Sequence, residues 1–544
     1  MQKKQRPAPA AHSSRTPSGQ VAAAVATLPT QREQALGRLA VVLLALWAAM
    51  LGLTPVTAND IWLQMKVGAD VLASGEFPTT EVYSATASGR PFIAYEWLSS
   101  VLFHVVGDGH LWGLSVLCAL VYGGVFCLLY FALAPGLRAR PWTLPMLALA
   151  VYLIHFRTQI RPHILSDLLL CGLVFVIERW RRDRKSSRLI VLPLVFVAWV
   201  NAHGAYMLGL ALLAALTGAA ACMWLLPMAR RASEPGEPYT ARQVRDLGLV
   251  TMACGLATLV NPYGYRIWVL SLDFAFGFHY FKGDVIEWRS PFAIHPESGQ
   301  FLFLGWGSYW FHLYAVTVVG YALLALVRWR RVSLFDAGLL ATSIYLSVTA
   351  NRFVTYVPIL GLAGAVRGVG EIVRTWRPQW ERIDWSRVHA AGACLLIVLA
   401  GVWGYVYESG QYRPVGVGDG GRHPDGAIAH IRRTGLRGTV FNNFRDGCYI
   451  VHELYPDVRP VMDSRIDIYG GELFAEFQAA ERGVPAFRSY LDKYDIDLVL
   501  LPRVTHCVDI FYWLDAQPRW KKVYEDPSPD GRVDPWSYVL YRRS

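Results

Sequence analysis

Long apolar segments separated by short polar turns make up most of the chain from residue 38 to residue 408. An α-helix needs roughly 20 apolar residues to cross the hydrocarbon core of a bilayer, or somewhat fewer when its ends lie in the interface. The pattern therefore predicts an α-helical polytopic membrane protein with about 11 transmembrane helices. The predicted spans are residues 38–53, 110–134, 142–157, 164–180, 189–201, 204–228, 246–260, 301–327, 334–350, 353–367 and 388–408.

An amphipathic segment follows the first span and is expected to lie on the membrane surface. Residues 60–74 place Ile61, Trp62 and Met65 on one apolar face, and Gly75 after them suits a helix C-cap. This segment belongs to the first predicted extracytoplasmic loop, residues 54–109.

The two ends of the chain differ from the apolar region in composition and in the pattern of their apolar residues. Residues 1–37 are rich in Ala, Pro, Ser and Gln and are expected to form a disordered, basic cytoplasmic tail. In residues 409–544, short apolar runs such as IDLVLLPR alternate with amphipathic stretches such as IYGGELFAEFQAA, which predicts an extracytoplasmic α/β domain. Residues 520–543 read as two strands that close its sheet, joined by a turn at residues 529–531.

Composition and charge agree with a membrane protein and indicate its orientation. Of the 544 residues, 54% are hydrophobic and 17% are charged, against about 25% charged in ordinary soluble domains. The net charge of +11 does not indicate nucleic-acid binding, because basic residues gather at alternate turns, as they do on the cytoplasmic side of a membrane. This places the N-terminus in the cytoplasm and residues 409–544 outside it, and we expect the inner membrane of a bacterium. The basic turns are residues 138–140, 179–188, 230–245, 328–331 and 367–387.

The opposite turns end in a mixture of acids, bases, amides and imidazoles. An ionisable group near a membrane span costs about 2.5 to 3.5 kcal/mol, so clustering is expected only where the groups face a cavity or each other. The mixture therefore predicts a binding site on the outer face. Its candidate residues are Asn59, Asp60, Glu96, Arg157, Gln159, Arg161, His163, Asn201, His203, Glu287 and Arg352.

The residue types in this cluster limit the chemistry. The sequence has no H-E-x-x-H or C-x-x-C metal motif, no phosphate-binding P-loop and no G-x-S-x-G nucleophile motif. A carboxylate beside guanidinium groups remains, and this pairing can activate a hydroxyl and hold a phosphate. Structural roles without catalysis remain alternatives for these residues. Asn59 and Asp60 could cap the surface helix, and His203 could be a hydrogen-bonded interfacial residue. The arginines could extend to lipid headgroups.

Polar residues also follow the predicted strands of the C-terminal domain, where open α/β sheets form binding crevices. The candidates for acceptor binding are Asn443, Asp446, Asp463 and Arg465. A structural ion pair between Asp463 and Arg465 is the simpler explanation for two of them. Cys448 and Cys507 lie in the same domain, and they could form a disulfide or remain buried free thiols.

The sequence resembles the GT-C superfamily of polytopic membrane glycosyltransferases. The resemblance is carried by N-D-I-W-L-Q-M-K-V-G-A-D in the first loop and by N-x-H-G, N-P-Y-G and V-M-D-S-R-x-D-x-Y-G farther along. It implies that Asp60 is the general base of an inverting transfer, which moves a sugar from a polyprenyl-phosphate carrier to a hydroxyl of a lipid, glycan or protein. It also implies that Arg161 and Arg352 stabilise the leaving phosphate.

One departure from the superfamily concerns the acceptor. Where the oligosaccharyltransferase subunit has W-W-D-Y-G, the nearest segment here is Asn443-Phe444-Arg445-Asp446-Gly447, which lacks the tryptophans. A peptide acceptor is therefore not expected. The metal-binding acidic motifs of that enzyme are also not evident, so we expect no metal and no cofactor.

Two interpretations from other classes compete with a transferase. The outer cluster could be the vestibule of a transporter or of a lipid- or polysaccharide-handling protein, which internal repeats and intramembrane acids would favour. The chain could also be a non-catalytic scaffold for envelope assembly that keeps the same fold.

Overall fold

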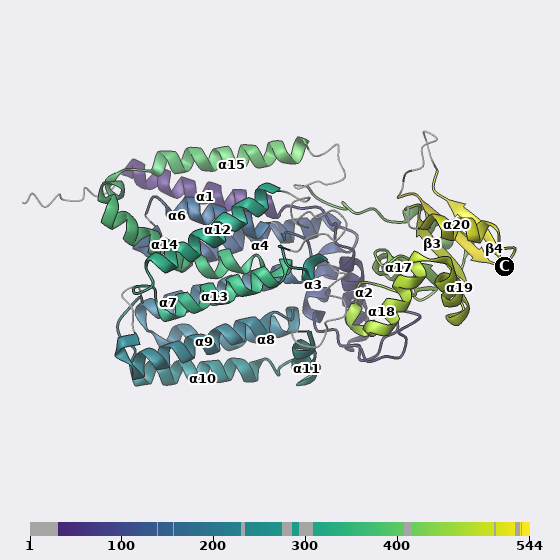
Figure 1. The fold of residues 1–544 in the computed structure, drawn as a ribbon, viewed down its shortest axis with the longest axis horizontal. Helices are drawn as coiled ribbons and strands as arrows, with labels where there is room; N and C mark the ends of the chain where they lie inside the picture. Colours follow the sequence, from purple (N-terminus) through teal and green to yellow (C-terminus); the bar gives the residue numbers. More distant parts are fainter. Residues whose placement is uncertain are drawn as a thin grey trace, which may run out of the picture.

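The computed structural model describes residues 31–544 except 139, 156, 230–233, 275–285, 293–307, 407–415, 505–506, 528–533 and 535. It has two parts, a bundle of roughly parallel helices and an α/β domain seated on one end of that bundle (Figure 1). The predicted tail, residues 1–37, falls outside the described residues up to residue 30, and residues 31–37 begin the first helix.

Each predicted span coincides with a helix in its described residues, which confirms the helical membrane class. Among the described residues, four helical segments are long and apolar enough to cross a membrane by length and composition, namely Gln31–Gly52, Leu111–Ala132, Tyr206–Leu225 and Asn351–Trp376. The others are shorter, so the number of spans stays a prediction. The bundle helices are α1 (Gln31–Gly52), α4 (Leu111–Ala132), α6 (Thr143–His155), α7 (His163–Asp183), α8 (Leu192–Ala202), α9 (Tyr206–Leu225), α10 (Ala241–Ala257), α12 (Ser308–Val327), α13 (Leu334–Thr349), α14 (Tyr356–Trp376) and α15 (Ser386–Val406).

Short helices connect the bundle helices at both ends. These are α5 (Pro135–Arg138), η1 (Ser186–Leu189), η2 (Pro227–Ala229), α11 (Arg266–Leu272), η4 (Ile286–Trp288), η6 (Asn351–Phe353) and η7 (Pro378–Arg382).

The first loop forms a layer between the bundle and the α/β domain (Figure 1). It contains α2 (Asp60–Ser74), the predicted amphipathic helix, and α3 (Trp97–Gly107). α2 ends at Gly75, whose φ of 69° is the left-handed conformation that glycine adopts at helix ends. α2 and α3 pack closely because Gly68 has no side chain, and a Cβ there would collide with the Ser100 carbonyl oxygen.

The C-terminal domain is built on a five-stranded mixed sheet in the order β2-β1-β3-β5-β4. β1 pairs in parallel with β2 and β3, whereas β5 pairs antiparallel with β3 and β4. The α/β architecture is therefore confirmed, and the last two strands do close the sheet; their predicted turn at residues 529–531 lies outside the described residues. The strands are β1 (Gly438–Asn442), β2 (Val458–Pro460), β3 (Leu498–Pro502), β4 (Trp520–Glu525) and β5 (Tyr538–Arg543), and the helices are α16 (Asp425–Thr434), α17 (Gly447–Leu454), α18 (Ile466–Arg482), α19 (Val484–Lys493) and α20 (Val508–Asp515).

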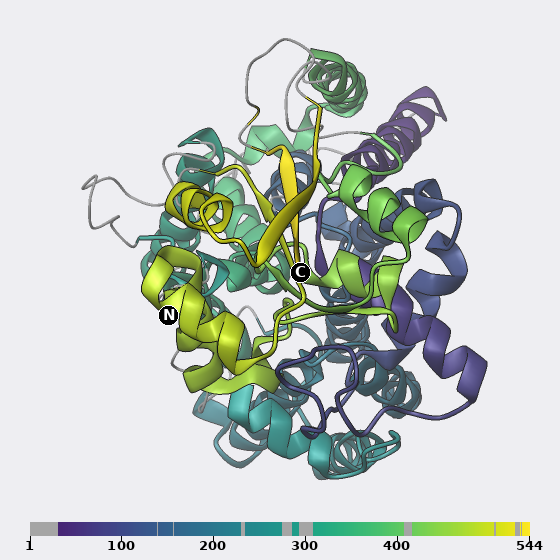
Figure 2. The ribbon, with the colours of Figure 1, turned by 90° about the vertical axis from the view of Figure 1, so that its right-hand side faces the viewer.

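A buried arginine fastens this domain to the first loop. Arg465 Nη2 lies 2.6 Å from the Asp463 carboxylate and donates to Glu81 Oε1 at 3.0 Å. Both carboxylates are fully buried. Arg90 of the loop donates in turn to the carbonyl oxygens of Ile468 and Tyr469, at 3.1 and 2.6 Å. The ion pair expected between Asp463 and Arg465 is present, and Arg465 extends it across the domain boundary to Glu81. Figure 2 views the molecule from the side of the α/β domain.

A second buried charge cluster holds the opposite end of the bundle together. Arg181 of α7 lies 2.7 Å from Glu178, 2.8 Å from Glu234 and 2.7 Å from Asp336 of α13. Arg367 of α14 lies 2.7 Å from Glu178 and 2.8 Å from Asp336. Some arginines of the basic turns thus pair with acids inside the protein, in addition to indicating orientation.

We expect Arg181→Ala to destabilise the protein by about 3 to 5 kcal/mol, because buried carboxylates would lose their partner. The apparent melting temperature in detergent should fall by several degrees. Arg242→Ala, whose side chain is 83% exposed, is the control and should melt like the wild type. Equal melting of both variants would contradict a stabilising role for the cluster.

Candidate active site

A cavity of about 280 Å³ lies where the bundle, the first loop and the α/β domain meet. It collects polar residues from every outward turn of the bundle that was expected to contribute, except the turn after α10. The lining residues are Asp60, Leu63, Gln64, Val67, Phe92, Ile93, Ala94, Tyr95, Glu96, Ser100, Arg157, Arg161, Pro162, His163, His203, Phe274, Glu287, Trp288, Arg352, Phe444, Ser464, Arg465, Ile466 and Asp467.

Asp60 is the first residue of α2, so the surface helix fixes its position at the base of the cavity. Its Oδ1 lies 3.1 Å from Nε of Arg161. Burial raises the pKa of the Asp60 carboxyl, with Arg161 opposing and Glu287 reinforcing the change. Asn59 occupies the N-cap position but makes no side-chain capping hydrogen bond. The capping interpretation therefore finds no support in the geometry of Asn59.

Arg161 connects Asp60 to a second carboxylate. Its Nη1 donates to Glu287 Oε1 at 2.6 Å. Glu287 belongs to η4 and also lies 3.9 Å from Arg157 Nη2. These arginines, with Arg352, outweigh the effect of burial and lower the pKa of Glu287 to about 2. Glu287 is thus a fixed negative charge that neutralises part of the arginine cluster.

Arg352 differs from the other arginines of the cavity in its partners. Its guanidinium lies over the Trp288 ring, 4.1 Å from the centroid, and Arg157 donates to its carbonyl oxygen. Among the described residues it forms no ion pair with a carboxylate. An arginine stays protonated even where it is shielded from water. Arg352 therefore offers a positive charge that a ligand anion could neutralise.

Glu96 lies on the other side of Asp60, at the start of α3. Gln64 donates to its Oε2 at 2.7 Å, and His203 Nε2 is 3.6 Å from its Oε1. Burial and the nearby Asp60 raise the pKa of Glu96 to about 8. Burial with Arg352 and Arg157 lowers the pKa of His203 to about 3. At neutral pH this side of the cavity thus carries a protonated acid and a neutral imidazole.

The α/β domain contributes a lining residue that the sequence prediction missed. Asp467, in the first turn of α18, faces the cavity, and burial raises its pKa to about 6. The expected Arg465 lines the cavity as well, although its guanidinium is committed to Asp463 and Glu81. The motif V-M-D-S-R-x-D-x-Y-G contains Asp467 and was the available signal.

Other predicted residues do not line the cavity. Asn201 bonds to the carbonyl oxygens of Val197 and Val260 and accepts from Trp97, so it links α8 to its neighbours. Asn59 and Gln159 lie beside cavity residues in the chain but not among the lining side chains. His163 does line the cavity, and its Nε2 lies 2.9 Å from the Arg157 carbonyl oxygen.

In the α/β domain, the remaining candidates make contacts within the domain. Asn443 accepts from the Asp446 amide at 2.8 Å, and Tyr538 donates to Asp446 at 3.1 Å. Asp463 is the buried partner of Arg465. Cys448 and Cys507 are both buried free thiols, so no disulfide joins them.

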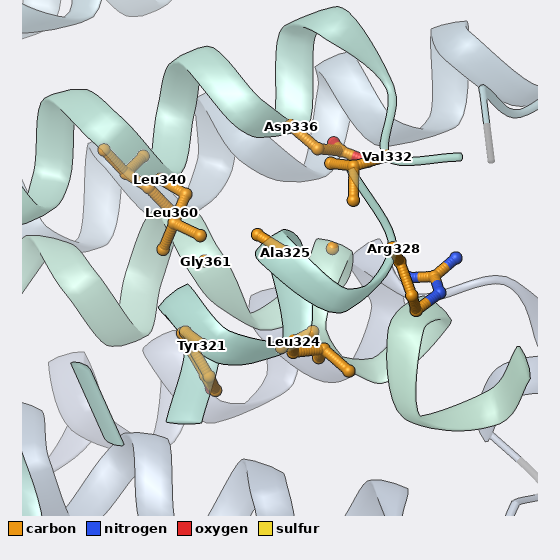
Figure 3. A pocket seen from close by; sticks show the side chains of 11 residues that line it. Tyr321, Leu324, Ala325, Arg328, Val332, Asp336, Leu340, Leu360 and Gly361 are labelled. Atoms are coloured by element: carbon orange, nitrogen blue, oxygen red, sulfur yellow. The ribbon is translucent and has the colours of Figure 1, made fainter. Parts of the chain in front are cut away.

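A smaller cavity of about 30 Å³ lies between α12, α13 and α14 near the other end of the bundle. Figure 3 shows Tyr321, Leu324 and Leu340 around it, with Arg328 and Asp336 at its edge. Its volume suits one or two water molecules and no substrate. A third cavity, of about 300 Å³, lies between α9 and α13 and is lined mostly by apolar residues. The 280 Å³ cavity gathers the ionisable side chains and is therefore the candidate active site.

No protein-family model and no curated protein matches this chain. Solved structures do match. The archaeal oligosaccharyltransferase AglB from Archaeoglobus fulgidus, in complex with an inhibitory peptide and a dolichol-phosphate, has a TM-score of 0.58 and 12% identity, over 95% of this chain and 75% of that chain. This chain has the GT-C fold.

Further structures of the same archaeal enzyme agree. The form tethered to an acceptor peptide has a TM-score of 0.56 and 14% identity, over 93% of this chain and 74% of that one. A complex with zinc and sulfate has a TM-score of 0.51 and 13% identity, over 93% and 73%. At these identities the likeness establishes the fold alone, which confirms the fold implied by the sequence resemblance.

The raised pKa of Glu96 can be measured without any substrate. We expect infrared difference spectra to show a protonated-carboxyl band that titrates with a midpoint of about 8 and is missing in Glu96→Gln. Glu476→Gln, on the surface of the α/β domain, is the control and should keep the band. A Glu96 band that titrates at the ordinary value near 4 would show that the cavity is well hydrated.

Proposed function

We propose that this protein is a membrane glycosyltransferase that moves a sugar from a polyprenyl-phosphate carrier to an acceptor hydroxyl on the outer face of the membrane. One observation carries the proposal. A partly buried carboxylate, Asp60, and an arginine that forms no ion pair with a carboxylate among the described residues, Arg352, line the same cavity at the end of a GT-C-fold bundle. In this proposal the candidate base and the candidate phosphate ligand act on the same bound donor and acceptor.

In the proposed reaction, Asp60 is the general base. Its carboxylate takes the proton of the acceptor hydroxyl while that oxygen attacks the anomeric carbon of the donor. The bond between this carbon and the phosphate oxygen breaks, and polyprenyl phosphate leaves with the bonding electrons. Attack from the face opposite the leaving group inverts the anomeric configuration. The raised pKa of Asp60 makes it a stronger base than an exposed aspartate.

Arg352 and Arg157 are the proposed ligands of the leaving phosphate. Guanidinium groups bind phosphate oxygens through paired hydrogen bonds and stay charged in a desolvated site. Arg157 already donates to the Arg352 carbonyl oxygen, which holds the Arg157 side chain against the backbone of Arg352. The Trp288 ring packs against the Arg352 guanidinium and would help to position it for the donor.

The fold neighbours support this class of donor. The AglB structure is a complex with dolichol-phosphate, a polyprenyl phosphate. In this chain the outer ends of α6, α8 and α13 point to the cavity, so a carrier lipid would present its phosphate there from the membrane. The acceptor would enter from the side of the α/β domain.

Asp60→Asn should lower the transfer rate by about 10²- to 10⁴-fold, because the amide cannot accept the proton. Cells carrying this variant should accumulate the carrier-linked sugar, which lipid mass spectrometry would detect and identify. Asp70→Asn is the matched control on the same helix, outside the cavity, and should leave the carrier lipids as in the wild type. Unchanged carrier lipids in Asp60→Asn, with the protein present in the membrane, would refute the assignment.

Arg352→Ala should lower kcat/KM for the donor by about 100-fold, because the charge that stabilises the leaving phosphate is lost. Arg352→Lys should recover only part of this loss, since an ammonium cannot form the paired hydrogen bonds. Steady-state kinetics with varied donor would measure both effects. A donor kcat/KM that Arg352→Ala leaves unchanged would remove Arg352 from the phosphate site.

The transfer rate should also depend on pH in a defined direction. The base must be deprotonated, and burial raises the pKa of Asp60. The rate should therefore fall as the pH decreases, with the midpoint above the value near 4 of an exposed aspartate. A pH profile of kcat/KM, measured over the range in which the protein stays folded, tests this.

A further inference from the structure

A guanidinium stands between the candidate base and a second acid. Arg161 Nε lies 3.1 Å from Asp60 Oδ1, and Nη1 of the same side chain lies 2.6 Å from Glu287 Oε1. The three residues come from separate elements: the start of α2, the turn before α7 and η4. One planar cation thus joins the first loop, the bundle and the segment before α12.

This position is the one a bridging metal ion would occupy. A divalent cation binds oxygen ligands from several carboxylates at about 2.0 to 2.6 Å. Here Asp60 and Glu287 already face a permanent positive charge, which would repel a second cation at this distance. Among the described residues, no three His, Cys, Asp or Glu side chains gather as metal ligands. These residues therefore do not fit a metal ion as the chain stands.

We propose that Arg161 is a positioning residue that takes the place of a divalent cation, holding the Asp60 carboxylate in its reactive orientation and leaving the phosphate to Arg352 and Arg157. The proposal rests on the proposed function for its catalytic part. It changes the role that the sequence resemblance implied for Arg161, because its Nη1 already donates to Glu287 and its Nε lies at ion-pair distance from Asp60.

The geometry explains why this role needs arginine. The guanidinium presents several donors in one plane, so two carboxylates from different elements can be bound at fixed angles. Neighbouring Ile160 is fully buried and Pro162 restricts the backbone, so the turn that carries Arg161 is anchored. A lysine ammonium would be a single point charge and could not fix both acids in the same way.

The charge of Arg161 also sets the titration of the base. It lowers the pKa of Asp60 against the effect of burial. The acidic, phenolic and thiol groups near Asp60 include Glu287, Glu96, Tyr95 and Cys448, and Arg157 and Arg352 line the same cavity. Because Arg161 is the cation at ion-pair distance from Asp60, the pKa of Asp60 should rise when Arg161 is removed.

The test uses the full-length protein with Arg161→Ala, which leaves two carboxylates facing an empty space. The melting temperature of purified Arg161→Ala should rise when Mn²⁺ or Mg²⁺ is added. The melting temperatures of the wild type and of Arg352→Ala should not change. This measurement needs no substrate, so it stands apart from the transferase assignment. Arg161→Gln, which fills more of the space, is the second variant if Arg161→Ala is not recovered folded.

Transfer-rate measurements test the same proposal once a donor is known. Wild-type transfer should be unchanged by EDTA, and Arg161→Ala should lose about 10²- to 10³-fold in rate. Mn²⁺ should restore at least part of that loss, and the acidic side of the pH profile should move to higher pH. These shifts are not expected if Arg161 only contributes to folding.

Other results would overturn the proposal. Wild-type activity abolished by EDTA and restored by a divalent ion would show that a metal is used. Arg161→Ala with no metal-dependent stabilisation would show that the guanidinium does not replace a cation. A raised KM for the donor with an unchanged pH profile would return Arg161 to the phosphate site. If Asp60→Asn transfers normally, the proposed function fails, while the binding result on Arg161→Ala stands by itself.

Discussion

The cost of removing charge from water governs both ends of this molecule. At the end opposite the α/β domain, Arg181 has no exposed surface and its charge is balanced by Glu178, Glu234 and Asp336. At the other end the balance is incomplete. In the part of the chain that the structure describes, the Arg352 guanidinium contacts aromatic rings and forms no ion pair with a carboxylate, and Glu96 has a pKa raised to about 8. An arginine whose charge is not balanced and a carboxyl with a strongly raised pKa are expected at a binding site, where a bound ligand supplies the missing partner.

The electrostatics of the candidate active site depend on the packing of the α/β domain against the first loop. Without that domain, the polar ends of the bundle helices would face water, and exposed carboxylates and arginines would titrate near their ordinary values. Arg465, Glu81 and Asp463 form the contact that holds the domain on the first loop. The same segment continues into the turn that carries Asp467 into the cavity. A single buried ion cluster thus couples the fold of the domain to the electrostatics of the site.

Close packing within the first loop fixes the candidate base. α2 can approach α3 because Gly68 lacks a side chain, and this places Asp60 at one end of α2 within reach of Arg161 from the bundle. Gln64, one turn along the same helix, holds Glu96. The helix therefore organises two carboxyls whose pKa values are both raised by burial, one paired with a cation and one with an amide.

The sequence by itself determined the class of the protein, the positions of the helices and the α/β nature of the C-terminal domain, and it indicated the turns that line the cavity. Hydrophobic length and alternation are local properties, so residues near each other in the chain specify them. Which polar residues face the cavity was decided by the tertiary structure. Asn201 and Asp446 looked like site residues but bond within the protein, whereas Asp467 faces the cavity. The partners of Arg161 come from distant segments, and only the folded chain brings them together.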